Sequence, residues 1–539
     1  MPISPGAARL RWRDPMSELV NLTIDGTPVS VPKGTTLIEA AKQAGVLVPH
    51  YCYHPSLPSP AVCRMCLVEV EKNPKLQPSC VTTVAEGQVV HVNSVNAKKA
   101  RESVLEFLLI NHPLDCPICD QAGECELQDY VFQEGRSGTR YEDYAKRYNP
   151  VEDFGPDVLY VPNRCILCTR CVRFMDDVAD EPVLNVSERG DRAYIGIDPA
   201  HKLTHEWSGN VVDLCPVGSL VSKDFLHKAR AWDLDKSASV CTGCSQGCNI
   251  TVETRDDAVV RLKPRPNLEV NRHFMCDTGR RDYRWMNRGD RVEAPLVRQD
   301  ARLQATDWLK GFEALAALVK GANGPVIVLA SGRASVESLA LTKQLVAGKS
   351  ATLAVQIPMS KDAEAPLKGV PNLALRQERA PNAKGAEWLG YSKDWSAAVS
   401  AAKSAALVLV VGAELSDAEW ASLRGAKAVG VLAAVDALGD EVAQVVLPIT
   451  TVVEELGAYV NRDGRVQRYW PAKAAPGMAR PAWWVAGEVA SLIAGGDAPQ
   501  SVEAAFKVAT TMAPQLGGVS YSELGFIGRS TAAAPAGVA

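Results

Sequence analysis

The sequence lacks most features that mark export, membrane insertion or nucleic-acid binding. It has no uncharged apolar run of about 18 residues, so no transmembrane helix is expected. Only 6% of the 539 residues are aromatic, and a formal net charge of −4 argues against binding that depends on phosphate neutralisation. Arg9, Arg11 and Arg13 lie near the start, but the apolar core of a secretory signal is missing.

Motifs for nucleotide binding and for common hydrolytic chemistry are also missing. The sequence contains no G-x-G-x-x-G fingerprint, no phosphate-binding P-loop and no H-E-x-x-H zinc motif. It also has no G-x-S-x-G nucleophile elbow. We therefore expect no substrate-binding active site and no catalytic residue in this chain.

What the sequence does have is cysteine, in an unusual distribution. All 15 cysteines lie between Cys52 and Cys276, and none follows. Without export, they are expected in a reducing compartment, where disulfides are rare, and an odd number fits a disulfide framework poorly. Metal ligation is therefore the leading interpretation of the cysteines.

The first hundred residues predict a small α+β domain. A strand over 19–24, an Asp25-Gly26 turn and a second strand through Val29 and Val31 form a typical hairpin signal. A helix is predicted over 36–44, ended by Gly45. Another is predicted over 97–111, with Phe107 on its apolar face, and Pro113 stops it.

The rest of the chain changes character twice. Residues 136–163 are polar and rich in loop formers, which predicts a linker. After Asp277 the chain is alanine-rich, and the short apolar runs 325–330 and 406–411 are each followed by a glycine and a helical stretch. This alternation predicts a parallel α/β domain. Residues 1–16 and 531–539 are expected to be a disordered extension and tail.

The first candidate ligand set has the spacing C-x10-C-x2-C-x13-C and consists of Cys52, Cys63, Cys66 and Cys80. Four cysteines can bind zinc, but structural zinc sites usually contain two close pairs and this set contains one. The asymmetry is typical of [2Fe–2S] loops of the plant type, although their first gap is shorter. We therefore favour a [2Fe–2S] cluster.

The second set, H-x3-C-x2-C-x5-C, consists of His112, Cys116, Cys119 and Cys125. A lone histidine at a helix end is more often solvated or packed than a ligand, but three cysteines follow it closely. A tetranuclear cluster takes four ligands, which favours His112 as the fourth. Because a helix C-terminus favours the imidazolium cation, cluster binding is expected to compete with a proton at this residue.

Two further sets complete the allocation. C-x2-C-x2-C with a remote Cys-Pro resembles bacterial ferredoxins, although free cysteine is also often a buried small hydrophobe. This third set consists of Cys165, Cys168, Cys171 and Cys215. The fourth set also fits [4Fe–4S] better than zinc, and consists of Cys241, Cys244, Cys248 and Cys276. The four sets use all 15 cysteines and His112.

Four arginines lie beside these ligands: Arg64, Arg164, Arg170 and Arg173. One interpretation is a solvated basic surface. The other is a tuning role, because neighbouring cations stabilise the reduced and more negative state of a cluster.

Three motifs resemble one family closely: Cys63-Arg-Met-Cys66-Leu-Val-Glu-Val, Asn111-His-Pro-Leu-Asp-Cys116-Pro-Ile-Cys119-Asp and Arg164-Cys165-Ile-Leu-Cys168-Thr-Arg-Cys171-Val-Arg-Phe. They resemble the large iron–sulfur subunit of NADH:quinone oxidoreductase, respiratory complex I. The resemblance covers roughly residues 17–290. It implies one [2Fe–2S] and three [4Fe–4S] clusters on the four sets, with the fourth cluster off the main electron path, as in some bacterial members.

The resemblance also implies partners and a location. The partners are the other subunits of the peripheral arm, namely the flavin-bearing, NADH-binding subunit and the downstream iron–sulfur subunits. The expected location is the cytoplasmic side of the bacterial inner membrane, with membrane contact only through the complex and no contact with nucleic acid.

The second half resembles the molybdopterin oxidoreductase fold, through Val446-Leu-Pro448, Glu454, the segment 457–467, Pro476-Gly477 and Arg480-Pro481. It is short and contains no cysteine after Cys276, so a degenerate scaffold without molybdopterin is expected. The predicted fold is α+β iron–sulfur domains, the first a β-grasp ferredoxin, followed by a reduced α/β domain. The predicted domains span 17–95, 96–135, 136–235, 236–290 and 291–530.

Two other functions remain open at this point. The chain could be the iron–sulfur part of an NAD-linked hydrogenase or formate dehydrogenase, although the latter should retain a molybdenum ligand. It could also be a zinc-stabilised assembly scaffold without electron transfer. Metal analysis separates these alternatives.

Overall fold

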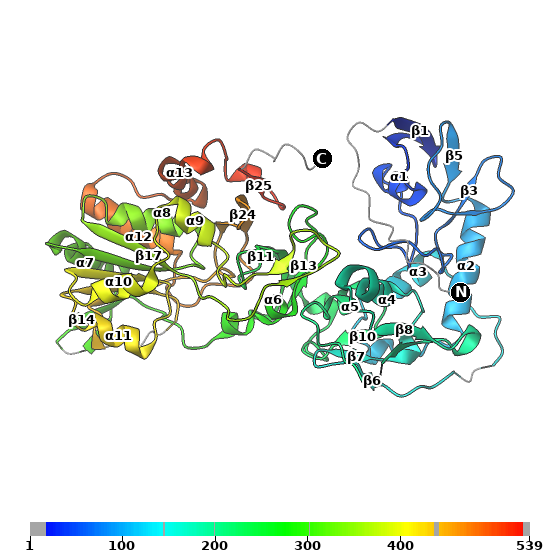
Figure 1. The fold of residues 1–539 in the computed structure, drawn as a ribbon, viewed down its shortest axis with the longest axis horizontal. Coiled ribbons are helices and arrows are strands. Elements are labelled where there is room, and N and C mark those ends of the chain that lie inside the picture. Colours follow the sequence, from blue (N-terminus) through cyan, green and yellow to red (C-terminus); the bar gives the residue numbers. More distant parts are fainter. Residues whose placement is uncertain (1–17, 144–145, 199, 301, 436–440, 532–539) are drawn as a thin grey trace. The chain divides into compact units, whose positions relative to one another are not determined.

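The computed structural model describes residues 18–143, 146–198, 200–300, 302–435 and 441–531 (Figure 1). The predicted N-terminal extension, and all of the predicted tail except Thr531, lie outside these residues. The chain forms two compact units, which we describe separately. The first contains the described residues up to 233 together with 367–371, and the second contains the others.

The first unit begins with the predicted hairpin and helix. Strands β1 (Leu19–Ile24) and β2 (Thr27–Pro32) pair antiparallel around Asp25 and Gly26, which both have positive φ. Helix α1 (Leu37–Gln43) is followed by Gly45, whose φ of +74° ends it as expected. The sheet order is β2-β1-β5-β3-β4, with β3 (Leu67–Val70), β4 (Gln77–Pro78) and β5 (Gln88–His91).

Helix α2 (Val95–Leu109) forms where a helix was predicted, but it packs a different face. Phe107 is 76% exposed, whereas Ala97, Arg101 and Leu105 are buried. Arg101 is buried because its guanidinium pairs with Glu134 at 3.0 Å and donates to the carbonyl of Val92. Glu134 ends α3 (Glu126–Glu134), so a long-range ion pair decides which face packs, and the local apolar pattern does not contain that information.

The prediction of a linker over residues 136–163 is wrong in part. It contains β6 (Glu152–Asp153), β7 (Val158–Tyr160) and the 3-10 turn η2 (Pro162–Arg164). These strands form a sheet with β10 (Leu220–Ser222), which lies far along the chain and supplies hydrogen bonds that local composition does not reveal. The other elements of this unit are η1 (Cys116–Ile118), α4 (Arg170–Arg173), the π-helical turn η3 (Phe174–Ala179), β8 (Leu184–Ser187), η4 (Gly190–Arg192), β9 (Tyr194–Ile197), α5 (Asn210–Leu214) and η5 (Ala231–Asp233).

The second unit begins with an antiparallel meander and continues into the predicted α/β region. The meander is β11 (Asp235–Val240), β12 (Asn249–Arg255) and β13 (Ala258–Pro264), followed by α6 (Asp277–Arg281) and η6 (Arg284–Asn287). A seven-stranded sheet has the order β15-β14-β22-β21-β20-β16-β17. Its strands are β14 (Leu296–Gln299), β15 (Arg302–Ala305), β16 (Val326–Ser331), β17 (Ala351–Gln356), β20 (Leu407–Val411), β21 (Val429–Ala433) and β22 (Val445–Pro448).

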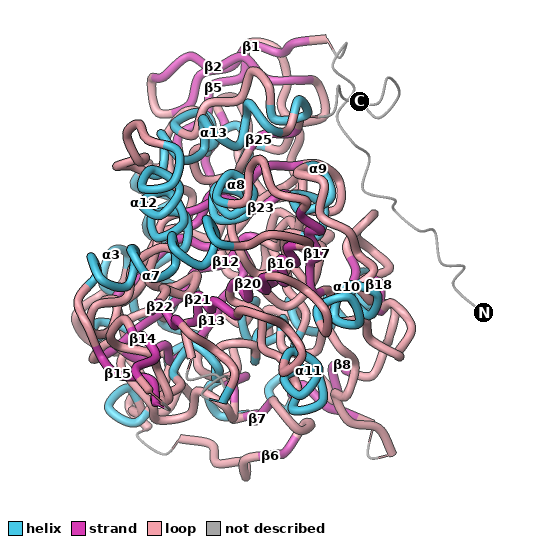
Figure 2. Tube along the Cα trace, turned by 90° about the vertical axis from the view of Figure 1, so that its left-hand side faces the viewer, coloured by secondary structure: helices cyan, strands magenta, loops and turns pink. Residues whose placement is uncertain are grey.

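The α/β prediction is confirmed for the five parallel strands, whereas the antiparallel edge formed by β14 and β15 was not predicted. Alternate residues of β16 enter two cores on opposite faces: Val328 packs with one set of helices and Leu329 with the other. The first core includes α7 (Trp308–Gly321), α8 (Val336–Leu345), α12 (Ala482–Ala494) and α13 (Val502–Met512), and the second includes α10 (Trp395–Ala402) and α11 (Asp417–Leu423). Figure 2 shows the row of strands between these helices.

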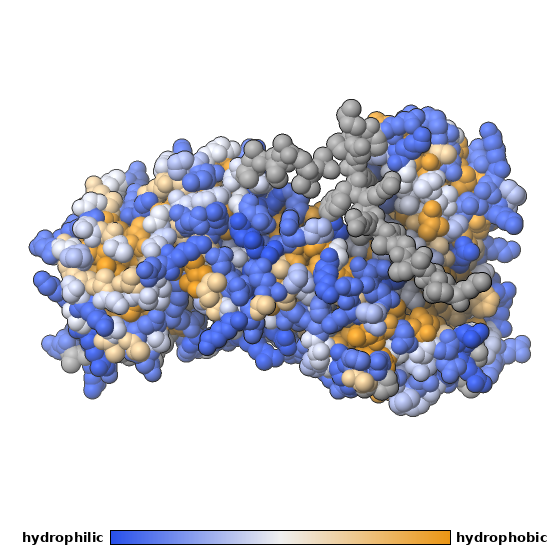
Figure 3. All heavy atoms as spheres, viewed as in Figure 1, coloured by the Kyte–Doolittle hydropathy of each residue, from blue (hydrophilic) through white to orange (hydrophobic). Residues whose placement is uncertain are grey.

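Short elements complete the second unit: β18 (Ala365–Pro366), β19 (Ala374–Leu375), α9 (Ala383–Trp388), β23 (Gly457–Val460), β24 (Arg465–Tyr469), η8 (Pro514–Leu516), η9 (Ser522–Leu524) and β25 (Arg529–Ser530). The face in Figure 3 mixes polar and apolar side chains. None of the helices in the described ranges is long and apolar enough to cross a membrane.

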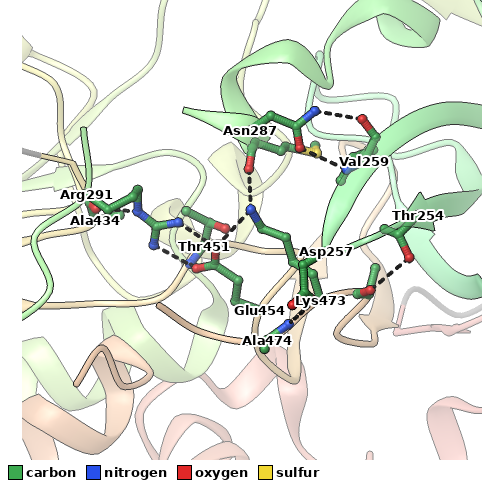
Figure 4. A network of polar contacts seen from close by, with 12 residues as sticks. Thr254, Asp257, Val259, Asn287, Arg291, Ala434, Thr451, Glu454, Lys473 and Ala474 are labelled. Atoms are coloured by element: carbon green, nitrogen blue, oxygen red, sulfur yellow. Dashed lines mark hydrogen bonds and ion pairs between the residues drawn. The ribbon is translucent and has the colours of Figure 1, made fainter. Parts of the chain in front are cut away.

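A buried polar network joins the meander to the α/β sheet (Figure 4). The guanidinium of Arg291 pairs with both carboxylate oxygens of Glu454, at 2.5 and 2.7 Å, and the Glu454 side chain is fully buried. Lys473 donates to the carbonyl of Met286, and the neighbouring Asn287 bonds both backbone groups of Val259 on β13. The meander that carries the fourth cysteine set is therefore anchored to the sheet by polar contacts.

Candidate metal centres

The first set lies on the loops around β3. Cys52, Cys66 and Cys80 are buried and Cys63 is half-buried. The residue after Cys63, Arg64, has a φ of +59°, which turns the chain tightly between Cys63 and Cys66. The Cys52 amide donates to the Cys63 sulfur at 3.4 Å. The Cys80 thiol interacts with those of Cys52 and Cys66, so the four predicted ligands lie together.

The second set lies between α2 and α3. Cys116 is exposed, whereas Cys119 and Cys125 are buried, and the three thiols interact electrostatically. The site is tightly packed from one side: a Cβ added at Gly218 would lie 2.1 Å from the Cys119 sulfur. A residue larger than glycine at position 218 would therefore displace this sulfur.

His112 is half-buried beside the same loop and does not have the environment expected from the sequence. Burial lowers the pKa of its imidazole to about 4, and the charges of Lys146 and Arg164 act in the same direction. The cation at the end of α2 is Lys146, whose ammonium donates to the carbonyls of Leu109 and Ile110 at 3.0 and 3.1 Å. Burial therefore favours the neutral imidazole, the form that binds a metal, over the cation that a helix C-terminus would favour.

The third set gathers cysteines from two distant segments. Cys165, Cys168, Cys171 and Cys215 line one small cavity. Leu167 and Thr169 both have positive φ, so the chain wraps tightly between the first three. Burial raises the pKa of Cys168 to about 12 and that of Cys215 to about 11. Cys215 therefore joins the triplet, as predicted from sequence, and its ligand role remains a prediction.

The fourth set is the most enclosed, since all four cysteines are buried. Cys241, Cys244 and Cys248 lie between β11 and β12, and Cys276 caps α6, where its sulfur accepts from the Gly279 amide at 3.3 Å. A Cβ at Gly279 would lie 3.0 Å from the Cys241 sulfur and 3.2 Å from that of Cys276.

Strand β24 and the turn before it also contact the loop that carries Cys244 and Cys248. Gln467 donates to the carbonyl of Gly247 at 2.8 Å, and Asn461 donates to that of Gln246 at 3.3 Å. Gly247 itself has a φ of +67°, and a Cβ there would lie 2.8 Å from the Gln467 amide oxygen. The C-terminal region thus contacts the fourth set directly, which sequence reasoning missed because the contact joins residues about 220 positions apart.

The donor chemistry fits polynuclear iron–sulfur groups. All 15 cysteines are free thiols, and four thiolates gathered in a buried site need a cationic group to balance their charge. A zinc ion would require its sulfurs at about 2.3 Å from one centre. In a [4Fe–4S] cluster each ligand binds a different iron atom, and in a [2Fe–2S] cluster two ligands bind each iron atom, so the sulfurs of a set are spread more widely than around one zinc ion.

The arginines beside the ligands are not all solvated. Arg64 is exposed, but Arg164 and Arg170 are only 9% and 4% exposed. Arg164 pairs with Asp115 at 3.0 Å, and Arg170 forms a two-pronged pair with Glu126 at 2.9 and 3.0 Å. Asp115 precedes Cys116 and Glu126 follows Cys125, so both pairs tie the second set to the third. The solvated interpretation is wrong for these two residues.

The second unit also contains a cavity of about 430 Å³ that no sequence motif indicated. It lies at the carboxyl ends of β16, β20, β21 and β22, the position where parallel sheets commonly bind ligands. Its lining includes Arg333, Trp285, Gly412, Thr451 and Glu455.

Five segments match known families. Residues 17–95 match the 2Fe-2S iron-sulfur cluster binding domain, and 101–140 match the NADH-ubiquinone oxidoreductase-G iron-sulfur binding region. Residues 155–221 match the ferredoxin-like domain of NADH-quinone oxidoreductase subunit 3. Residues 234–288 match the molybdopterin oxidoreductase Fe4S4 domain, and 434–492 match molybdopterin oxidoreductase. The predicted order of fold classes is confirmed.

Relatives of known name agree with these matches. The G subunit of NADH-quinone oxidoreductase from Rickettsia felis is 40% identical over 61% of this chain and 49% of its own length. The mitochondrial NADH-ubiquinone oxidoreductase 78 kDa subunit of Neurospora crassa is 44% identical over 60% of this chain and 44% of its own length. The chain thus spans about half the length of these relatives.

A solved structure, an NAD+-reducing [NiFe]-hydrogenase in the H2-reduced state, matches at 28% identity over 39% of this chain and 90% of that chain. Its TM-score of 0.36 is too low to bear on fold or function. The iron–sulfur domains and the sequence relatives point the same way: the chain is a homologue of the G subunit of NADH-quinone oxidoreductase.

Proposed function

We propose that this chain relays electrons in the peripheral arm of a respiratory NADH:quinone oxidoreductase, from the flavin-bearing subunit toward quinone. The observation that carries the proposal is a single buried core shared by three ligand sets. Cys52, Cys125 and Cys168, one from each set, pack in this core with Tyr51 and Val217. Redox groups held there would be close together and shielded from water, which is what a relay requires.

We assign a [2Fe–2S] cluster to the first set and [4Fe–4S] clusters to the other three, with His112 as the one ligand that is not cysteine. These groups would supply reversible one-electron storage. The protein's own contribution is to bury the thiols, to place Arg164 and Arg170 beside them and to keep the His112 imidazole neutral. The domain boundaries proposed above follow these four assignments.

The fourth set and the α/β region are assigned a different task. The set lies in the second unit, enclosed by glycines and by Gln467 and Asn461, so we propose that its cluster stabilises the fold and lies off the main path. The sequence has no cysteine after Cys276 that could serve as a molybdenum ligand. This supports a scaffold without a cofactor, which we propose packs against neighbouring subunits. The chain would then have no substrate site of its own and would contact the membrane only through its complex.

Metal analysis of the purified full-length chain tests this proposal. We expect iron and acid-labile sulfide in equal amounts, with visible absorption that bleaches on reduction and no molybdenum. Zinc in place of iron would support an assembly scaffold, and stoichiometric molybdenum would support a formate dehydrogenase. Either result would reject the relay.

A further inference from the structure

Arg173 contacts the backbone of two ligand sets at once. Its Nη2 donates to the carbonyl oxygen of Cys52 at 2.6 Å and to that of Cys168 at 3.1 Å. The two carbonyls belong to ligands of the first and the third set, and Cys52 lies 121 positions before Arg173 in the chain. A single nitrogen therefore joins the loops that carry the two sets.

The remaining donors of the guanidinium hold it in place. Nη1 donates to the carbonyl of Pro58 at 2.5 Å, and Nε donates to the Thr169 hydroxyl at 3.3 Å. Thr169 lies between Cys168 and Cys171, and Pro58 lies between Cys52 and Cys63. Each set is thus bound at two points by one planar group whose donors have fixed directions.

The charge of Arg173 is also placed differently from that of its neighbours, since its acidic neighbour Asp177 acts on it electrostatically without an ion pair. Arg164 and Arg170 are each neutralised by a carboxylate, Asp115 and Glu126. No carboxylate in the described part of the chain forms an ion pair with Arg173, which binds only uncharged oxygens. A half-buried cation with no carboxylate in direct contact acts more strongly on nearby redox groups than a paired or solvated one.

We propose that Arg173 is a positioning residue that fixes the separation of the first and third sites and raises the reduction potentials of both bound clusters. The inference rests on the proposed relay function. The potentials rise because a cation stabilises the reduced and more negative state. The second and fourth clusters should be unaffected, since none of the groups that bind Arg173 belongs to their ligand loops.

The test compares Arg173→Gln, Arg173→Lys and the control Arg189→Gln in the full-length chain with its clusters assembled. Each variant is titrated electrochemically while its centres are followed by EPR. In Arg173→Gln, the ratio of reduced to oxidised protein at a fixed potential should fall about tenfold for the binuclear centre and the third-set centre, or about 59 mV for one electron. Arg189 is exposed and lies outside every ligand loop, so its removal should leave every potential unchanged.

Arg173→Lys separates the effect of loop positioning from that of charge. Lysine keeps the positive charge but lacks the planar array of guanidinium donors. Its potentials should stay near the native values, while the magnetic interaction between the first and third centres weakens. Unchanged potentials in Arg173→Gln, an equal shift of all four centres, or native coupling in Arg173→Lys would overturn the inference. If Arg173→Gln does not assemble, the lysine variant alone decides. A native chain without any iron–sulfur signal would reject the relay function and this inference with it, whereas native clusters with unchanged potentials in Arg173→Gln would reject this inference alone.

Discussion

The first three ligand sets and the fourth are built on different principles. In the first unit, the sets share one core and are joined by arginines that reach from one set to another. In the second unit, the fourth set is enclosed by glycines and by amide side chains that bind its backbone. The first arrangement suits groups that exchange electrons, because it brings them together. The second arrangement suits a group that stabilises a fold, because close packing encloses the site on several sides.

Ligand removal should separate the two regions most strongly. In Cys119→Ala, one [4Fe–4S] signal should disappear and electron flow from NADH to quinone should stop, because the proposed relay runs through the second cluster. EPR and turnover of the assembled complex measure both effects. Unimpaired turnover would refute this placement.

Cys244→Ala is the matched variant in the other region. It should lower the yield of assembled complex, while the turnover of the molecules that assemble stays native. A complex that assembles fully but transfers electrons slowly would place the fourth cluster on the path.

Adding one methyl group should also affect the regions unequally. Gly218→Ala would bring a carbon within 2.1 Å of the Cys119 sulfur, so we expect loss of the second cluster, measured as iron content and EPR intensity. Gly279→Ala meets sulfurs at 3.0 and 3.2 Å, which a small shift can accommodate, so most of the fourth cluster should remain. Gly138→Ala has open space and serves as the control. Equal losses in the first two variants would contradict the packing described here.

The polar network around Arg291 and Glu454, which anchors the meander of the fourth set, should contribute to stability and not to electron transfer. Glu454→Ala leaves the guanidinium of Arg291 buried without its partner, which typically costs about 3–5 kcal/mol. Thermal unfolding should show this decrease in the free energy of unfolding. The EPR spectra of the first three clusters should remain native. The control, Glu441→Gln, removes an exposed pair with Arg424 and should cost at most about 1 kcal/mol. Similar costs for both would show that the network does not stabilise the unit.

A smaller effect is expected from pH. Burial raises the pKa of Glu337 to about 8 from an ordinary value of 4.5. Between these values the folded state holds a proton that the unfolded state releases, so stability falls as pH rises from about 4.5 to about 8. Glu337→Gln should flatten this dependence in urea unfolding series. A slope as steep as that of the native protein would show that Glu337 is not its source.

The sequence predicted those features that depend on local pattern. The hairpin β1–β2 forms around Asp25-Gly26 because that turn matches strand twist, and the four cysteines grouped by spacing as the third set line one cavity. Features that depend on long-range pairing were not predictable. The strand β7 forms only because β10 pairs with it, and Arg164 and Arg170 are buried only because Asp115 and Glu126 meet them. The low pKa of His112 likewise comes from burial and from distant Lys146 and Arg164.

An EPR redox titration of the native full-length chain tests the central claim most directly. Four assembled sites predict one binuclear and three tetranuclear centres, and Cys116→Ala should remove one of the three. His112→Ala should change the spectrum and potential of that same centre. A titration that shows no iron–sulfur signal, or a His112→Ala variant whose centres are all native, would contradict the assignment of the four sets.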